Sequence, residues 1–162
     1  MRRDEAGRRG LDLSVFTPYR VAVLGRAMSE RLGEAYSNED LTIPEWRVLA
    51  VVSQADAVAA RDVVKRTPMD KMAVSRAVAS LEAKGLVQRS PAPDRRMAAL
   101  RLTPKGAGVF ERVSAIALAY EAALLAALSA DERRAFLEAL SKLEAAIENA
   151  AAAAEGDPRA AE

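Results

Sequence analysis

The side chains with the clearest chemical meaning are basic ones in the middle of the chain. Residues 61–105 carry 11 basic and 4 acidic side chains, a local net charge of +7, although the whole chain carries only +1. Lysine and arginine at this density suit phosphate groups, so the pattern indicates a surface that binds a polyanion such as nucleic acid. A solvated charged surface would give the same pattern, and charge alone does not separate the two interpretations.

The 162 residues contain no cysteine and no histidine. Their absence excludes disulfides, thiol-based sensing, cysteine nucleophiles, thiolate or imidazole zinc sites and Ser-His-Asp relays. The remaining Asp, Glu, Lys, Tyr and Ser residues show no paired-carboxylate motif, and no glycine-rich phosphate loop is recognisable. We therefore expect a protein that is not an enzyme and that uses no cofactor and no metal.

The composition predicts a helical protein of the cytoplasm. Apolar residues make up 51% of the chain, charged residues 29% and aromatic residues only 4%. No apolar run reaches the roughly 18 residues that a membrane span needs, so no membrane partner is expected. The N-terminal segment MRRDEAGRRG is charged and lacks the apolar core of a secretory signal.

Apolar spacing and capping residues predict six helices. Thr17 is the expected N-cap of the first helix, and Thr42 with Glu45 has the spacing of a capping box at the second. Gly85 ends the fourth helix, and two short strands around a proline-rich basic loop follow it. The predicted helices span approximately residues 13–36, 43–54, 60–66, 70–84, 104–128 and 130–148.

The fourth predicted helix has two unlike faces. At about 100° per residue, Val74, Ala77, Val78 and Leu81 share one side, and short side chains surround Arg76 on the other. The major groove of DNA admits a helix with a small, polar or basic outer face. Together with the short helix before it and the basic hairpin after it, this helix predicts a winged helix-turn-helix. The expected fold class is therefore mainly α with a small β-hairpin.

Three segments in this region resemble the MarR (multiple antibiotic resistance regulator) family of bacterial transcription factors. The family's second helix is similar to LTIPEWRVLAVV, its recognition helix and first wing strand to MDKMAVSRAVASLEAKGLVQR, and its wing to DRRMAALRLTPKG. The resemblance implies a homodimer held by the first, fifth and sixth helices. Two-fold symmetry then implies a pseudo-palindromic DNA operator with half-sites about 34 Å apart.

The resemblance also assigns the DNA contacts. Lys71, Met72, Ser75 and Arg76 would lie at the groove-facing start of the recognition helix, with Arg76 the candidate for bidentate guanine contact. Contact with a phosphate, or plain solvation, is the alternative for Arg76. Met72 could touch a thymine methyl group or pack under the wing, and Ser75 suits a phosphate better than a base.

At the tip of the hairpin, Arg96 matches the family's wing arginine and Arg95 is its neighbour. Both would enter the minor groove, where arginine is favoured. Asp94 would brace Arg96 rather than touch DNA, because phosphates repel a carboxylate. Where many relatives carry Ser or Thr at the start of the third helix, this chain has Ala59 and Ala60, which removes one expected phosphate contact.

Family members commonly bind a small molecule between the dimerisation helices and the DNA-binding region. Aromatic and arginine side chains on the elements expected there would suit an aromatic carboxylate. Packing in the core is the competing interpretation for the aromatic residues, and pairing with an interface carboxylate for the arginines. The segments PYR and IPEWRVLA resemble a subgroup that includes regulators of aromatic-acid (hydroxycinnamate) degradation, so an aromatic acid or its CoA thioester is the expected effector. The candidate ligand contacts are Tyr19, Arg20, Arg26, Trp46, Arg47 and Tyr120.

These features predict a sequence-specific, dimeric transcriptional regulator, with a repressor released by a small organic ligand as the leading interpretation. A transcriptional activator, a ligand-independent DNA binder and a protein-interaction module with a winged-helix fold stay open as alternatives. The phenylalanine, leucine and isoleucine spacing of the sixth helix is compatible with a dimer seam or with intramolecular core. The expected organisation is a disordered N-terminus (1–12), a dimerisation helix (13–40), the DNA-binding lobe (41–103), dimerisation helices (104–148) and a loose tail (149–162).

Overall fold

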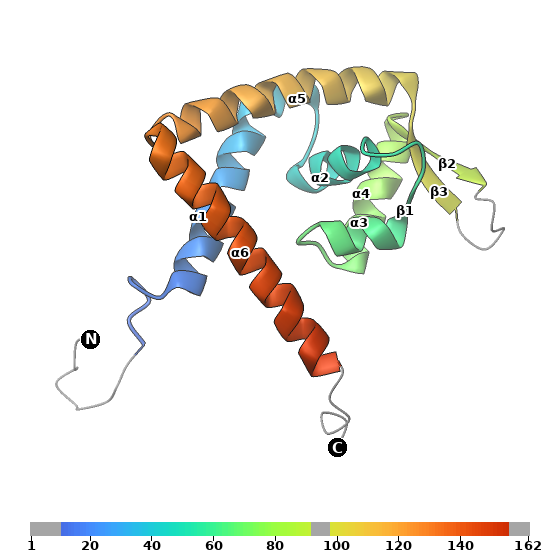
Figure 1. Ribbon diagram of the computed structural model, residues 1–162. Helices are drawn as coiled ribbons and strands as arrows, with labels where there is room; N and C mark the ends of the chain where they lie inside the picture. The colour runs from blue at the N-terminus through green and yellow to red at the C-terminus, as the bar shows by residue number, and fades with distance from the viewer. Residues whose placement is uncertain (1–10, 92–97, 156–162) are drawn as a thin grey trace. The chain divides into compact units, whose positions relative to one another are not determined.

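The computed structural model describes residues 11–91 and 98–155, and Figure 1 shows their helices and strands. The chain forms two compact units, one up to Tyr120 and one from Glu121 onward. The elements confirm a mainly helical fold with a small antiparallel sheet. In chain order they are α1 (Thr17–Ala35), the 3-10 turn η1 (Ser37–Glu39), α2 (Ile43–Val52), β1 (Val58–Ala59), α3 (Ala60–Arg66), α4 (Lys71–Ala83), β2 (Val87–Pro91), β3 (Ala98–Leu102), α5 (Pro104–Leu125) and α6 (Ala130–Glu155).

The sheet has three antiparallel strands in the order β1-β3-β2. The predicted hairpin is β2 and β3, whose register pairs Val87 with Leu102. Strand β1 was not predicted, because its two residues are too few to show a period of two. It pairs Val58 with Leu100 and so attaches the start of α3 to the sheet.

Local capping explains where most of the helices begin and end. The Thr42–Glu45 capping box opens α2, and the Asp70 carboxylate accepts a hydrogen bond from the Ala73 backbone nitrogen (2.6 Å) at the start of α4. Gly85 has a positive φ of 68°, as expected of the residue that ends α4. The predicted cap of α1 was wrong: Phe16 is the N-cap, without a side-chain bond, and Thr17 is already helical.

The core of the first unit lies between α2, α3, α4 and the sheet, which Figure 1 shows grouped together. The predicted stripe of α4 is buried, and it packs with buried valines and leucines of its neighbours. At the start of α5, a Cβ on Gly106 would overlap the carbonyl oxygen of Leu86. The backbone of α5 therefore approaches the strand more closely than any other residue type would allow. Other core members are Val48, Leu49, Val52, Val63, Leu86, Val87 and Leu100.

The second unit consists of the end of α5 and helix α6. The predicted capping box is present: the Ser129 backbone nitrogen donates to the Glu132 carboxylate (2.9 Å), and the Glu132 nitrogen to the Ser129 hydroxyl (3.3 Å). Helix α6 runs to Glu155, so helical structure extends into the segment expected to form a loose tail. Its apolar side chains are 40% to 70% exposed in the single chain; they are Phe136, Leu137, Leu140, Leu143 and Ile147.

Within the described ranges, no single helix is both long and apolar enough to cross a membrane. The broken pair formed by Pro104–Leu125 and Ala130–Ala150 meets the length and composition test only when taken together.

One acidic side chain is buried in the described part of the first unit. Glu45 is 2% exposed, and its carboxylate accepts hydrogen bonds from the Thr42 backbone nitrogen (2.7 Å), the Ser80 hydroxyl (2.6 Å) and the Lys84 ammonium (3.1 Å). Burial by itself raises the pKa of Glu45. The hydrogen bonds from Ser80, Thr42 and Lys84 outweigh it and lower the pKa to about 2.

This lowered pKa predicts acid sensitivity. The contribution of Glu45 to stability is fully present above its unfolded pKa of about 4.5 and is lost as pH falls toward 2. That pKa gap corresponds to about 3 kcal/mol of unfolding free energy. Glu45→Gln should be less stable than the wild type at neutral pH and should show a shallower loss between about pH 5 and pH 3. Urea unfolding from about pH 3 to pH 7 measures the free energy of unfolding of both proteins. If that free energy fell equally steeply with pH in the wild type and in Glu45→Gln, the lowered pKa of Glu45 would be contradicted.

Candidate nucleic-acid interface

The outer face of α4 is free of core contacts. Lys71, Ser75 and Arg76 are exposed, and Met72 is 64% exposed. In the part of the chain that the structure describes, Lys71 and Arg76 form no ion pair. Because the tip of the hairpin lies outside the described residues, the choice between a thymine contact and packing under the wing stays open for Met72. Helix α4 therefore presents a short, basic surface opposite its buried stripe, as the sequence predicted.

A groove beside this face gathers further basic side chains. It lies between α3, α4 and β2, has a volume of about 500 Å³ and has an apolar floor that includes Val64 and Val74. Arg61 and Lys65 of α3, Lys71 of α4 and Arg89 of β2 line it together with Ser75. The Glu82 carboxylate accepts a hydrogen bond from the Arg89 Nε (2.9 Å) and holds that side chain in place.

No motif in the sequence singles out Arg61, Lys65 or Arg89. Their contribution was visible only in the summed charge of residues 61–105. Placing them beside α4 requires the packing of α3 on α4 and the course of β2, neither of which follows from periodicity. The basic last turn of α3 is a sequence signal that could have pointed to Lys65.

The tip of the hairpin lies outside the described residues. Strand β2 ends at Pro91 and β3 begins at Ala98, so Asp94, Arg95 and Arg96 fall in the gap between them. The two strands place this gap at the end of a regular antiparallel ladder, in which Pro91 pairs with Ala98. The three wing residues stay predictions.

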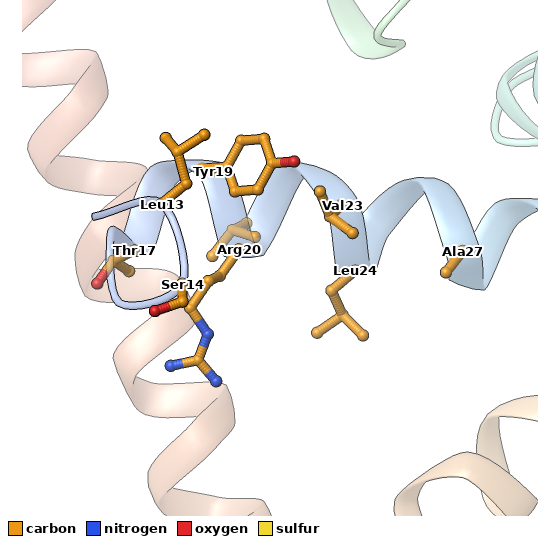
Figure 2. Close-up of a pocket in the computed structure, with 9 residues that line it drawn as sticks. Leu13, Ser14, Thr17, Tyr19, Arg20, Val23, Leu24 and Ala27 are labelled. Carbon is orange, nitrogen blue, oxygen red and sulfur yellow. The ribbon is translucent and has the colours of Figure 1, made fainter. Parts of the chain in front are cut away.

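The candidate ligand residues separate into different places. Arg26 and Arg47 line one groove of about 570 Å³ between α1 and α2, where the Arg47 guanidinium donates a hydrogen bond to the Ser29 hydroxyl (3.1 Å). Tyr19 and Arg20 line another groove, formed by α1 and the residues just before it. Figure 2 shows Tyr19 on one side of that helix and Arg20 on the other.

Trp46 and Tyr120 are both partly buried. The Trp46 ring stacks on Phe110 with centroids 5.8 Å apart and lies 5.9 Å from the ring of Tyr36. This packing agrees with the core interpretation that the sequence left open for Trp46. Tyr36 itself is 1% exposed, and its hydroxyl has no hydrogen-bond partner within the described ranges.

Comparison with known proteins decides the family. The family model described as "MarR family" matches residues 39–97. A solved MarR family transcriptional regulator from Silicibacter pomeroyi is 30% identical, with a TM-score of 0.70, and the match covers 83% of this chain and 98% of that one. The chain belongs to the MarR family. Members of this family are transcriptional regulators, not enzymes.

Three further relatives of this chain are transcriptional regulators by their descriptions. A variant of MarR from E. coli, solved in complex with operator DNA, is 26% identical with a TM-score of 0.73, covering 83% of this chain and 98% of that one. An HTH-type transcriptional repressor of Mycobacterium tuberculosis is 29% identical over 126 residues, 77% of this chain and 88% of the relative. An uncharacterized HTH-type regulator of Bacillus subtilis is 32% identical over 103 residues, 63% of each chain. The chain thus matches less than two thirds of the Bacillus relative's length, and these matches identify the family but no subgroup within it.

The basic groove yields a salt-dependence prediction. Arg61→Gln and Lys65→Gln should each lower the affinity for any DNA duplex and reduce the slope of log affinity against log salt by about 1. Sequence preference should not change, because phosphate contacts carry no base information. Fluorescence anisotropy at several salt concentrations measures the slope. Arg31→Gln, on the exposed face of α1 and paired with Glu34 (2.9 Å), is the matched control and should leave the slope unchanged.

Proposed function

We propose that this MarR family protein is a sequence-specific, dimeric DNA-binding regulator that acts in the cytoplasm as a repressor. The observation that carries the proposal is the outer face of α4. It carries Lys71 and Arg76 together with short side chains such as Ser75 and Ala79, it is free of core contacts, and it adjoins a basic groove between α3, α4 and β2. A helix with this face suits the major groove of double-stranded DNA.

In the proposed complex, each part has one task. Arg76 reads a guanine through two hydrogen bonds, and Ser75 and Lys71 contact the backbone beside it. The basic side chains of α3 and β2 neutralise phosphates and set the register. Arg96, with Arg95 next to it and Asp94 bracing it, would enter the adjacent minor groove from the wing.

Dimerisation is supported by apolar side chains that the single chain leaves exposed. On α6 these are Phe136, Leu140 and Leu143, at spacings of four and three residues. Helix α1 exposes Tyr19 and Val23 among others. Monomeric proteins rarely leave large contiguous apolar patches in water, so a second copy of the chain is the proposed partner. Two recognition helices related by two-fold symmetry would then require a pseudo-palindromic operator.

Repression is favoured by the description of one relative, and DNA binding is favoured over protein binding by the chemistry of the face. The Mycobacterium relative is named as a repressor. An activator or a ligand-independent DNA binder would use the same DNA contacts, and gene expression in a deletion strain separates these from a repressor. A protein-interaction module would more often present aromatic or apolar side chains than the arginine and lysines found on α4 and α3.

We further propose that an aromatic carboxylic acid, or its CoA thioester, releases the protein from DNA. The groove between α1 and α2 supports this, because Arg47 is half-buried there and, among the described residues, donates only to the Ser29 hydroxyl. A ligand carboxylate could replace that hydroxyl with a charge-assisted bond. Arg26, 3.2 Å from the Glu30 carboxylate, is already paired and is the weaker candidate. Binding between α1 and α2 would shift the population of DNA-competent dimers.

The DNA-binding proposal predicts a specific defect in Arg76→Ala. Loss of the guanine contact should cost about 1–3 kcal/mol at the cognate duplex and relax the preference at one base pair. Affinity for scrambled duplex should fall much less. The test is anisotropy on cognate and scrambled duplexes, with Arg31→Ala as control. Equal losses on both duplexes would show that Arg76 contacts only a phosphate.

The effector proposal predicts a defect confined to one groove. With 4-hydroxycinnamate and its CoA thioester as probes, we expect the wild type to leave cognate DNA as the probe is added. Arg47→Met should remain bound at probe concentrations about tenfold higher, because it lacks the charge-assisted bond. Arg20→Met, in the separate groove on α1, should respond like the wild type. If Arg20→Met lost its response to the probe and Arg47→Met kept it, the effector site would lie in the groove lined by Tyr19 and Arg20 instead.

A further inference from the structure

The buried carboxylate of Glu45 does more than cap α2. A capping box needs only one bond to this carboxylate, from the Thr42 backbone nitrogen (2.7 Å), while the Glu45 backbone nitrogen donates to the Thr42 hydroxyl (3.4 Å). The same carboxylate also accepts from the Ser80 hydroxyl (2.6 Å) and lies 2.9 Å from the Lys84 ammonium. Both residues lie in the C-terminal part of the recognition helix and its cap. The N-terminus of α2 is therefore joined to the end of α4 by a partly buried ion pair.

Lys84 is the meeting point of several elements. Its ammonium also donates to the Asp40 carbonyl oxygen (2.5 Å), and Asp40 adopts a left-handed conformation with φ 52°. That conformation is uncommon for a residue other than glycine. The carbonyl oxygen of Lys84 in turn accepts a hydrogen bond from the Lys105 ammonium (2.8 Å) in the first turn of α5. The end of α4 is thus held by α2, by the loop before α2 and by α5.

We infer that Glu45 and Lys84 are positioning residues for base reading, fixing the angle at which α4 presents Arg76. This inference rests on the proposed DNA-binding function and adds two residues that do not touch DNA. The apolar stripe of α4 holds the helix against the core, but apolar packing is non-directional. The hydrogen bonds of the Glu45 carboxylate are directional and restrict rotation and tilt of the helix.

Lys84 and Arg76 are far enough apart along α4 that a small tilt of the helix at Lys84 would displace Arg76 appreciably. Eight residues of helix separate their Cα atoms by about 12 Å, so a tilt of about 10° would move Arg76 by about 2 Å. A bidentate base contact tolerates only a few tenths of an ångström, since hydrogen bonds weaken steeply outside their normal range. Flexible lysine contacts with phosphates tolerate such a shift. Loss of the Glu45–Lys84 pair should therefore lower selectivity more than overall affinity.

The test measures selectivity, defined as the affinity for a duplex selected by the wild-type protein divided by the affinity for a scrambled duplex. Lys84→Met removes the ammonium and keeps the apolar stem. We expect it to lower selectivity about tenfold, the scale of one weakened base contact, with an unchanged salt slope. If Lys84→Met is too unstable, Ser80→Ala removes a single bond to Glu45 and should lower selectivity in the same direction.

Two matched variants separate positioning from other roles. Lys105→Met removes the same charge near the same helix end but leaves the bridge to α2 intact, and Thr42→Ser changes the capping residue of α2 but keeps the hydroxyl that bonds to Glu45. Both should keep wild-type selectivity. An equal loss of selectivity in either one would overturn the inference, because helix capping or local charge would then explain the effect of Lys84.

A double-mutant cycle tests whether Lys84 acts through Arg76. On an Arg76→Ala background, Lys84→Met should cause almost no further loss of selectivity, because the side chain that Lys84 positions is absent. Additive losses would overturn the inference. A wild type with no selectivity would overturn the proposed function and this inference with it. A selective wild type matched by an equally selective Lys84→Met would overturn only the inference.

Discussion

Helix α4 must bury one face completely while leaving the other without protein contacts, and the rest of the first unit is arranged around that requirement. Val74, Val78 and Leu81 are at most 1% exposed, whereas Arg76 lies among them in sequence and is exposed. A period of about 3.6 residues makes this possible, since it places alternate groups of side chains on opposite sides. Helices α2 and α3 and the sheet supply the apolar surface that covers the buried face.

Polar contacts restrict the orientation of α4 and its neighbours, which non-directional apolar packing alone does not determine. The buried Glu45 carboxylate joins α2 to α4, and a second pair joins the preceding turn to α5. In that second pair the Arg112 guanidinium makes three hydrogen bonds of 2.8 to 3.1 Å to the Glu39 carboxylate. The hydrogen bond from Arg112 lowers the pKa of Glu39. The segment from Glu39 to Glu45 is therefore bonded both to α5 and to the C-terminal end of α4.

Much of this arrangement follows from local sequence. The Thr42–Glu45 and Ser129–Glu132 boxes, Gly85 and the stripe of α4 are short-range signals, and the structure confirms each of them. Strand β1 is too short to carry a period. The cap of α1 was misplaced because a Thr-Pro pair resembles a cap wherever it stands near a helix start. The wing arginines lie outside the described residues and are still known only from sequence.

The features that periodicity could not provide are contacts between distant residues. Glu45 and Lys84 are 39 positions apart, and nothing in the local pattern of either one indicates the other. The same is true of Arg61, Lys65 and Arg89, which share a groove only after α3 and β2 pack beside α4. For the ligand candidates, the fold supplied a distinction that the sequence lacked, by placing Arg47 and Arg20 in separate grooves.

The central claim is that two copies of this chain read DNA sequence through α4. It is tested most directly by incubating the full-length protein with a pool of randomised duplexes and sequencing those that remain bound through several rounds at physiological salt. We expect enrichment of an inverted repeat whose half-site centres lie one helical turn, ~34 Å, apart. A bound pool as random as the starting pool, released uniformly as salt rises, would contradict it.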